Sequence, residues 1–126
     1  GTGKLTRSFD RALVDAPCTG LGTVRRRPEI LLRVRPDDPR RMADLELSIV
    51  RNVAPLVRPG GLLAVATCSF AVAEGAELAM RIEAAVAGLT RVIDDATDPD
   101  GLARIGPWLD PARALDAYQL VRFVVA

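Results

Sequence analysis

Two short apolar segments, at residues 9–15 and 62–67, flank a stretch from Met42 to Val57 in which apolar residues recur at the spacing of one helix face. Short apolar segments separated by a helical pattern are typical of parallel strands that are buried by a crossover helix. The order therefore predicts an α/β fold in which the two segments are neighbouring parallel strands of one sheet.

The helical pattern has marked boundaries. Asp37 or Asp38 is a candidate N-cap, because a short side-chain oxygen there can accept a free backbone N–H. Pro55 lies inside the apolar pattern and is expected to bend or break the last turn, since proline donates no backbone hydrogen bond. Pro59-Gly60-Gly61 is expected to end the element before the next strand begins at Leu62.

The rest of the chain continues the alternation. The elements predicted there are a helix at residues 73–87, a short strand at 89–93, a long loop at 94–113 and a final strand at 118–125. The expected architecture has three layers, with helices on a mostly parallel sheet. Ligands of such sheets bind beyond the carboxyl ends of the strands. Asp15, Cys18 and Cys68 all stand at such ends, so a functional site is predicted at that edge.

Composition excludes several kinds of site. The chain of 126 residues has no His, which removes the commonest general base and metal ligand, and two Cys alone cannot form a four-ligand zinc site, so no metal is expected. No apolar run approaches the about 18–20 residues of a membrane span, and the N-terminus has no signal-peptide pattern. We expect a cytoplasmic protein with no membrane partner and two reduced thiols.

Charge is unevenly distributed along the chain. Residues 1–60 carry a net charge of +5 and residues 61–126 a net charge of −4. The basic excess begins at Arg25, Arg26 and Arg27 and extends to Arg41. Such a cluster can bind nucleic-acid phosphates. The alternative is a solvated surface in an Arg-rich chain, since Lys occurs once against sixteen Arg.

Each cysteine lies in a distinctive local sequence. Cys18 lies in Asp15-Ala16-Pro17-Cys18-Thr19-Gly20, and Cys68 lies in Thr67-Cys68-Ser69. A single free Cys is more often a small buried apolar residue than a reactive one. Together, after two successive strands, the motifs resemble the signature of the RsmB/Nop/Sun family of RNA cytosine-C5 methyltransferases. That family has an Asp-x-Pro-Cys-Ser/Thr-Gly loop and a Thr-Cys-Ser tripeptide.

The resemblance covers nearly the whole chain. The basic stretch at residues 23–30, the Pro-Gly-Gly turn at 56–61 and the opening of the last strand at 116–120 are similar to family features in the same order. Two departures stand out. The family's Glu-Asn-Glu patch is replaced by residues 73–77, which contain no Asn, and the Gly and Phe of its last-strand motif are replaced by Ala117 and Gln119.

The resemblance implies a class I, Rossmann-like methyltransferase fold that is only partial here. Residues 1–126 would be the carboxyl-terminal part of the catalytic domain, without its cofactor-binding first half, because no Gly-rich loop follows a strand before residue 9. The implied activity is methylation of carbon 5 of cytosine in RNA, with S-adenosylmethionine as cofactor and ribosomal RNA as the expected substrate. The isolated chain is expected to be inactive and to self-associate through an exposed strand edge.

The implied chemistry assigns a role to each residue. A thiolate that adds to carbon 6 of cytosine makes carbon 5 nucleophilic, which is covalent catalysis. Cys68 would be this nucleophile, and Cys18 would assist breakdown of the covalent adduct. Asp15 would lie beside the cytosine edge and the methionine part of the cofactor, which Pro17 would also contact. The residues expected to contact RNA phosphates are Arg25, Arg26 and Arg27.

Three alternatives stay open. The two cysteines exchange roles if this chain works as DNA cytosine methyltransferases do, since they take their nucleophile from a motif like Pro17-Cys18. The chain could instead be a non-catalytic relic that binds RNA or a partner subunit. A methyltransferase acting on an exocyclic amine is disfavoured, because Asp/Asn-Pro-Pro-aromatic would stand at residues 15–18.

Phe70 and Trp108 could stack on a base, but single aromatic residues are more often part of the core.

Overall fold

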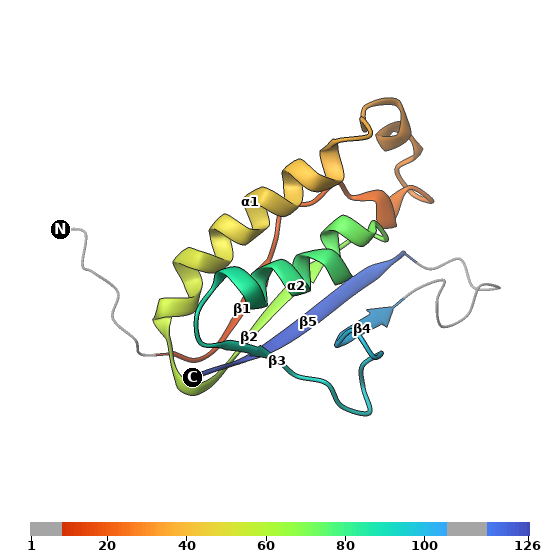
Figure 1. The fold of residues 1–126 in the computed structure, drawn as a ribbon. Coiled ribbons are helices and arrows are strands. Elements are labelled where there is room, and N and C mark those ends of the chain that lie inside the picture. The colour runs from red at the N-terminus through yellow and green to blue at the C-terminus, as the bar shows by residue number, and fades with distance from the viewer. Residues whose placement is uncertain (1–8, 106–115) are drawn as a thin grey trace.

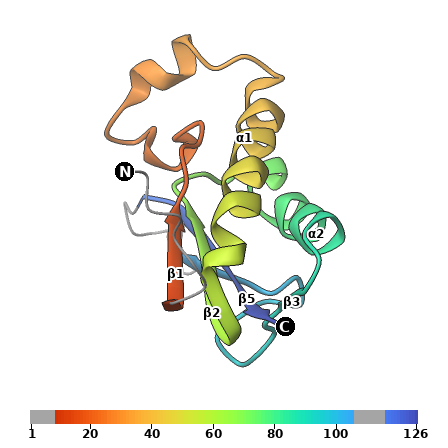
Figure 2. The same ribbon diagram turned by 90° about the vertical axis from the view of Figure 1, so that its left-hand side faces the viewer.

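The computed structural model describes residues 9–105 and 116–126. Its helices and strands are β1 (Phe9–Asp15), α1 (Asp38–Val53), β2 (Val57–Thr67), α2 (Ala76–Ala85), β3 (Leu89–Arg91), β4 (Leu102–Ile105) and β5 (Tyr118–Val125). The two helices lie beside each other on one face of the sheet (Figure 1, Figure 2). The described residues therefore form two layers rather than the three that the sequence pattern suggested. No helix among them is long and apolar enough to cross a membrane.

The sheet has the order β1-β2-β5-β3, and β4 also pairs with β5. β1 and β2 are parallel, as predicted. β5 runs antiparallel to β2, β3 and β4, so the sheet is mixed. The predicted α/β fold with flanking helices is confirmed. The direction of the last strand could not be predicted, because the alternation of apolar residues is the same in either direction.

The core lies between the helices and one face of the two central strands. Alternate residues of β2 and β5 point to this face because successive side chains of a strand face opposite sides. The buried residues that contribute most are Leu63, Val65, Val121 and Phe123 from the strands, Ala43, Leu47 and Val50 from α1, and Leu78, Ala79 and Ile82 from α2. The other face is less covered, and Leu13 of β1 is 65% exposed there.

The junction between α1 and β2 differs from the prediction. α1 ends at Val53, a short 3-10 turn follows at Ala54–Leu56, and β2 already begins at Val57. Val57 is fully buried and pairs with Phe9, whereas the next paired residue is Leu62. The Pro-Gly-Gly turn therefore bulges out of a strand that is already paired. The predicted break at Pro55 is confirmed, because proline cannot donate the backbone hydrogen bond that another α-helical turn needs.

The second half of the chain has shorter elements than predicted. α2 begins at Ala76, after a 3-10 turn at Val72–Glu74, and β3 ends at Arg91. The prediction of one long loop at 94–113 was wrong in part, because β4 lies inside it and pairs with β5. β4 has only four residues, too few for a recognisable alternation. Trp108 lies outside the described residues.

Candidate active site

The two cysteines are in contact. Their loops leave the carboxyl ends of β1 and β2, which are adjacent and parallel, so both loops begin at the same edge of the sheet. The Cys18 Sγ lies 3.2 Å from the Cys68 Sγ, and both residues are partly buried. Residues fifty positions apart in the sequence thus form one thiol pair, at the edge where the sequence predicted a site.

The environment of Cys18 holds its thiol in the protonated form. Burial, followed by the hydrogen bond with the Cys68 side chain, raises the pKa of Cys18 from 9.0 to about 12. Cys18 therefore keeps its proton at neutral pH. Either sulfur of the pair can be the hydrogen-bond donor, and Cys18, which keeps its proton, is able to donate to Cys68.

One buried carboxylate connects the two cysteine loops. The Glu74 Oε1 accepts a hydrogen bond from the Thr19 backbone N–H at 2.7 Å, and Oε2 accepts from the Thr19 hydroxyl at 2.6 Å. The Ser69 hydroxyl donates to the same Oε2, also at 2.6 Å. Thr19 directly follows Cys18 and Ser69 directly follows Cys68. Glu74 itself is only 2% exposed.

The backbone joins the same two loops. The Gly22 N–H donates to the Cys68 carbonyl at 2.9 Å, and the Gly22 carbonyl accepts from the Ala117 N–H at 2.8 Å. A methyl group at Gly22 would overlap the Ala117 carbonyl oxygen and lie 2.8 Å from the Cys68 oxygen. Only glycine allows an approach this close.

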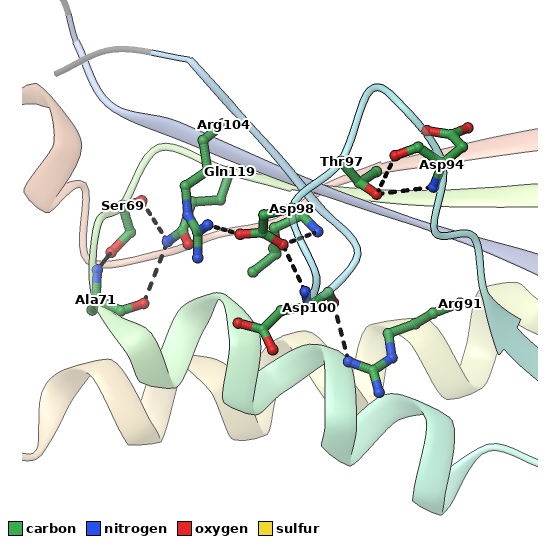
Figure 3. A network of polar contacts seen from close by, with 10 residues as sticks. Ser69, Ala71, Arg91, Asp94, Thr97, Asp98, Asp100, Arg104 and Gln119 are labelled. Atoms are coloured by element: carbon green, nitrogen blue, oxygen red, sulfur yellow. Dashed lines mark hydrogen bonds and ion pairs between the residues drawn. The ribbon is translucent and has the colours of Figure 1, made fainter. Parts of the chain in front are cut away.

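Gln119 supports the second loop from the last strand. Its Nε2 donates to the carbonyl of Ser69 at 2.7 Å and to that of Ala71 at 3.4 Å, as Figure 3 shows. Its Oε1 lies over Gly75, where a side chain would overlap it. The Gln119 side chain thus occupies space that a residue other than glycine at position 75 would need.

A pocket of about 900 Å³ opens in front of the thiol pair. Cys18 and Cys68 both line it, together with the rest of the first loop, the 3-10 turn at Pro28–Leu32 and the first half of α1. Its basic residues are Arg26, Arg27, Arg33 and Arg41. Asp38 also lines the pocket and pairs with Arg41 at 3.4 Å, so the four guanidinium groups leave an excess of positive charge beside the two thiols, which suits an anionic ligand.

The arginines expected to contact RNA are partly paired within the chain. Arg26 binds Asp116 through two hydrogen bonds, one of them from Nε at 2.8 Å, and this holds the pKa of Asp116 below its usual range. Arg25 lies 3.6 Å from the same carboxylate. Arg27 pairs with Glu29 at 3.2 Å. Arg26 and Arg27 line the pocket, whereas Arg25 does not.

The two residues expected beside the cofactor lie differently. Pro17 lines the pocket next to Cys18. Asp15 is exposed at the end of β1 and is not among the pocket's lining residues. The pocket thus contains Cys18, Cys68, Pro17 and two of the three predicted arginines. Glu74 and Gln119 were not predicted as site residues, and the one signal in the sequence is that Glu74 stands between the apolar or small residues Ala73 and Gly75.

A mixed sheet with two thiols at the ends of adjacent parallel strands places the chain in the class of partial class I methyltransferase folds. Residues 2–103 match the model of the family described as 16S rRNA methyltransferase RsmB/F, and the chain belongs to this family. The resemblance inferred from the two cysteine motifs is thereby confirmed.

Curated relatives agree with the family assignment. The chain is 52% identical over 61 residues to a probable ribosomal RNA small subunit methyltransferase B of Bacillus subtilis, a match that covers 48% of this chain and 14% of that protein. It is 35% identical over 111 residues to ribosomal RNA small subunit methyltransferase B of Thermus thermophilus, covering 86% of this chain and 27% of the relative. The chain thus spans about a quarter or less of these relatives.

Solved structures share the fold. The crystal structure of PH0851 superposes with a TM-score of 0.82 at 27% identity, over 94% of this chain and 27% of that one. A structure of NSun6 from Pyrococcus horikoshii with SFG superposes with a TM-score of 0.67 at 20% identity, over 90% of this chain and 29% of that one. Each superposition covers nearly all of this chain and less than a third of the larger protein.

Proposed function

We propose that this chain carries the catalytic cysteines of an enzyme that methylates carbon 5 of cytosine in ribosomal RNA, using S-adenosylmethionine, in the cytoplasm. The observation that carries the proposal is the 3.2 Å contact between Cys18 and Cys68 at the ends of adjacent strands. Membership of the 16S rRNA methyltransferase RsmB/F family and relatives named ribosomal RNA small subunit methyltransferase B support the substrate class.

The proposed chemistry begins at Cys68. Its thiolate adds to carbon 6 of cytosine, forming a C–S bond and making carbon 5 nucleophilic. S-adenosylmethionine supplies the methyl group when bound. A base then removes the remaining proton from carbon 5, and the C–S bond breaks with its electron pair returning to the Cys68 sulfur.

Cys18 is suited to the last of these events. It retains its proton, and its sulfur is 3.2 Å from that of Cys68. A thiol at that distance can donate a hydrogen bond to the departing thiolate, which stabilises the leaving group. This arrangement supports Cys68 as the nucleophile and Cys18 as the residue that assists product release.

RNA and cofactor would approach the thiols from the pocket side. Arg26, Arg27, Arg33 and Arg41 would bind phosphates around the target nucleotide. Pro17 would contact the cofactor from the pocket wall, and Asp15 would reach it and the cytosine edge from the end of β1. The chain spans about a quarter or less of the relatives that it matches. We therefore propose that residues 1–126 act as the carboxyl-terminal part of a larger catalytic domain.

A non-catalytic role is the second candidate. β1 pairs only with β2 in the described part of the chain, and its Leu13 side chain is largely exposed. An open apolar edge of this kind favours association with another strand, from a partner or from a second copy of the chain.

Release of hydrogen from carbon 5 tests the proposed function directly. The full-length enzyme that carries this chain would be incubated with S-adenosylmethionine and with ribosomal RNA tritiated at carbon 5 of cytosine. Methylation at carbon 5 must expel this hydrogen, so tritium should appear in water in step with methyl incorporation. Methyl incorporation without tritium release would assign the activity to another atom, and neither signal would favour the non-catalytic role.

A further inference from the structure

Glu74 receives hydrogen bonds from both cysteine loops at once. The donors are the residues that directly follow the two cysteines, Thr19 in the first loop and Ser69 in the second. The two hydroxyls also lie 3.4 Å from each other. A displacement of either loop would therefore break hydrogen bonds at the shared carboxylate.

The carboxylate is well suited to hold this arrangement. Glu74 is buried, and three donors at 2.6–2.7 Å satisfy its two oxygens. Hydrogen bonds to a buried charge are stronger than neutral ones and are costly to break. Glu74 is also anchored through its own backbone, since its carbonyl accepts from the Thr67 hydroxyl at 3.2 Å.

A second buried acid lies beside it. Glu46, on the inner face of α1, is fully buried, and neither of its side-chain oxygens has a hydrogen-bond partner within the described residues. Burial and the charge of Glu74 raise the pKa of Glu46 to about 9. Glu46 is therefore neutral at pH 7, whereas the three hydrogen-bond donors converge on Glu74.

We propose that Glu74 is a positioning residue that keeps the two thiols in contact, by fixing the Cys18 loop through Thr19 and the Cys68 loop through Ser69. Its consequence for catalysis rests on the proposed function. Glu74 touches neither sulfur in the described contacts and is not among the residues lining the pocket, so it acts through the loops. Without it, Cys68 can still add to cytosine, whereas Cys18 no longer lies where it can assist the departing thiolate.

Disulfide formation measures this contact without any RNA. Diamide accepts two electrons and two protons from two thiols, becoming a hydrazine and leaving one S–S bond. The full-length enzyme would be treated with diamide, and the Cys18–Cys68 linkage followed by peptide mass spectrometry. The wild type should form it rapidly, because the second thiol is already adjacent. In Glu74→Ala we expect a rate at least about 10-fold lower, since misplacement by about 1 Å is costly to such intramolecular steps.

Two further variants serve as controls. Glu77→Gln removes an acidic residue that is exposed and lies three positions along, so it should form the disulfide at the wild-type rate. Glu74→Gln keeps one acceptor oxygen of the same shape and should recover part of the lost rate. An unchanged rate in a folded Glu74→Ala protein would overturn the proposal. If Glu74→Ala does not fold, Thr19→Val removes one hydroxyl donor, and a wild-type rate in that variant would overturn the proposal equally.

Kinetics separate this proposal from the proposed function. Glu74→Ala should lower kcat by roughly 10- to 100-fold with little change in KM for RNA. An enzyme in which disulfide formation slows as expected but which never releases tritium from carbon 5 would retain the positioning role and lose the proposed function. Normal tritium release in the wild type, with unchanged kcat in Glu74→Ala, would reject the positioning role alone.

Discussion

Gln119 lies directly over Gly75, so that a methyl group on Gly75 would overlap the Gln119 Oε1 and lie 2.8 Å from its Cδ. Residues 73–77, which include Gly75 and no Asn, replace the Glu-Asn-Glu patch of the family, and Gln119 replaces the Phe of its last-strand motif. The two departures are therefore neighbours in space. The amide that binds the carbonyls of Ser69 and Ala71 comes from the last strand, and the glycine leaves room for it.

This relationship predicts strong coupling between the two positions. Gly75→Ala should destabilise the protein by about 1–3 kcal/mol, because the added methyl group overlaps a buried side chain. In a Gln119→Ala background the same change should cost clearly less, since the overlapping atoms are gone. A double-mutant cycle measured by chemical denaturation should give a coupling free energy of about 1 kcal/mol or more. Additive effects would contradict the packing of Gln119 against Gly75.

The raised pKa of Glu46 predicts an unusual dependence of the protein's stability on pH. Its pKa is raised from 4.5 to about 9 in the folded protein, mainly by burial. Between these values the native state holds a proton that the unfolded chain has lost, so stability should fall as pH rises through this window. Below pH 4.5 both states are protonated and the effect should vanish.

Glu46→Gln removes this titration while keeping the shape of the neutral acid. The variant should be more stable than the wild type by roughly 1–3 kcal/mol at pH 7–8, and the difference should shrink toward pH 5. Chemical denaturation across the pH range measures it. Glu77→Gln, at an exposed position, provides the control and should show no such trend. A difference that does not vary with pH would mean that Glu46 is ionised in the native protein.

Local patterns predicted the strands that flank the site. The bounds of β1 and β5 agree with the prediction, because β1 is an apolar segment between polar residues and β5 is mainly apolar from Tyr118 to Val125. The residues that pair between strands could be predicted less well from the sequence. The bulge at Pro59-Gly60-Gly61 exists because Val57 is already paired with Phe9. The residues of the turn give no indication of this pairing, since Phe9 is distant in the sequence.

The same limit applies to the site. The cysteine motifs were recognisable because they are contiguous in the sequence. The role of Glu74 depends on donors from Thr19, fifty-five positions away, and the pairing of Arg26 with Asp116 spans ninety positions. A carboxylate in a loop is normally solvated, and only the assembled fold shows that this one is buried with three donors.

Pocket arginines should control the salt dependence of RNA binding. The combined change of Arg26, Arg27 and Arg33 to Ala should weaken binding to all RNA sequences, because these residues line the pocket and would contact phosphates. The slope of log affinity against log salt should fall by about 0.7 for each single-strand phosphate that the variant no longer neutralises. Arg51→Ala, on an exposed part of α1 outside the pocket, should leave the slope unchanged. An unchanged slope in the triple variant would assign these arginines to surface solvation.

The 126-residue chain alone should not bind S-adenosylmethionine appreciably. Asp15 and Pro17 offer contacts at one strand end only, and the chain spans about a quarter or less of the relatives that it matches, so the other cofactor contacts would come from outside these residues. Isothermal titration calorimetry on the folded chain would check this, with the full-length enzyme as the positive control. Micromolar affinity of the chain alone would mean that the thiol pocket itself contains a complete cofactor site.

The two cysteines should respond differently to substitution in the full-length enzyme. Cys68→Ala should abolish both methylation and the covalent protein–RNA adduct, because the attacking thiolate is gone. Cys18→Ala should leave attack and methyl transfer intact but remove the thiol that stabilises the departing Cys68 sulfur. A protein–RNA complex should then accumulate and survive denaturing electrophoresis, while turnover falls by roughly 100-fold or more, as general acid assistance is commonly worth about 10²–10⁴.

The geometry makes the opposite assignment testable with the same gel. A thiol that keeps its proton is a poor nucleophile, and the pKa of Cys18 is raised to about 12 by burial and by Cys68. Cys18 as nucleophile would require RNA or cofactor binding to lower the raised pKa of its thiol. In that case Cys68→Ala would trap the adduct and Cys18→Ala would prevent it. The double variant, which can neither attack nor assist, should show no adduct under either assignment. An adduct in the double variant would mean that a third residue is the nucleophile.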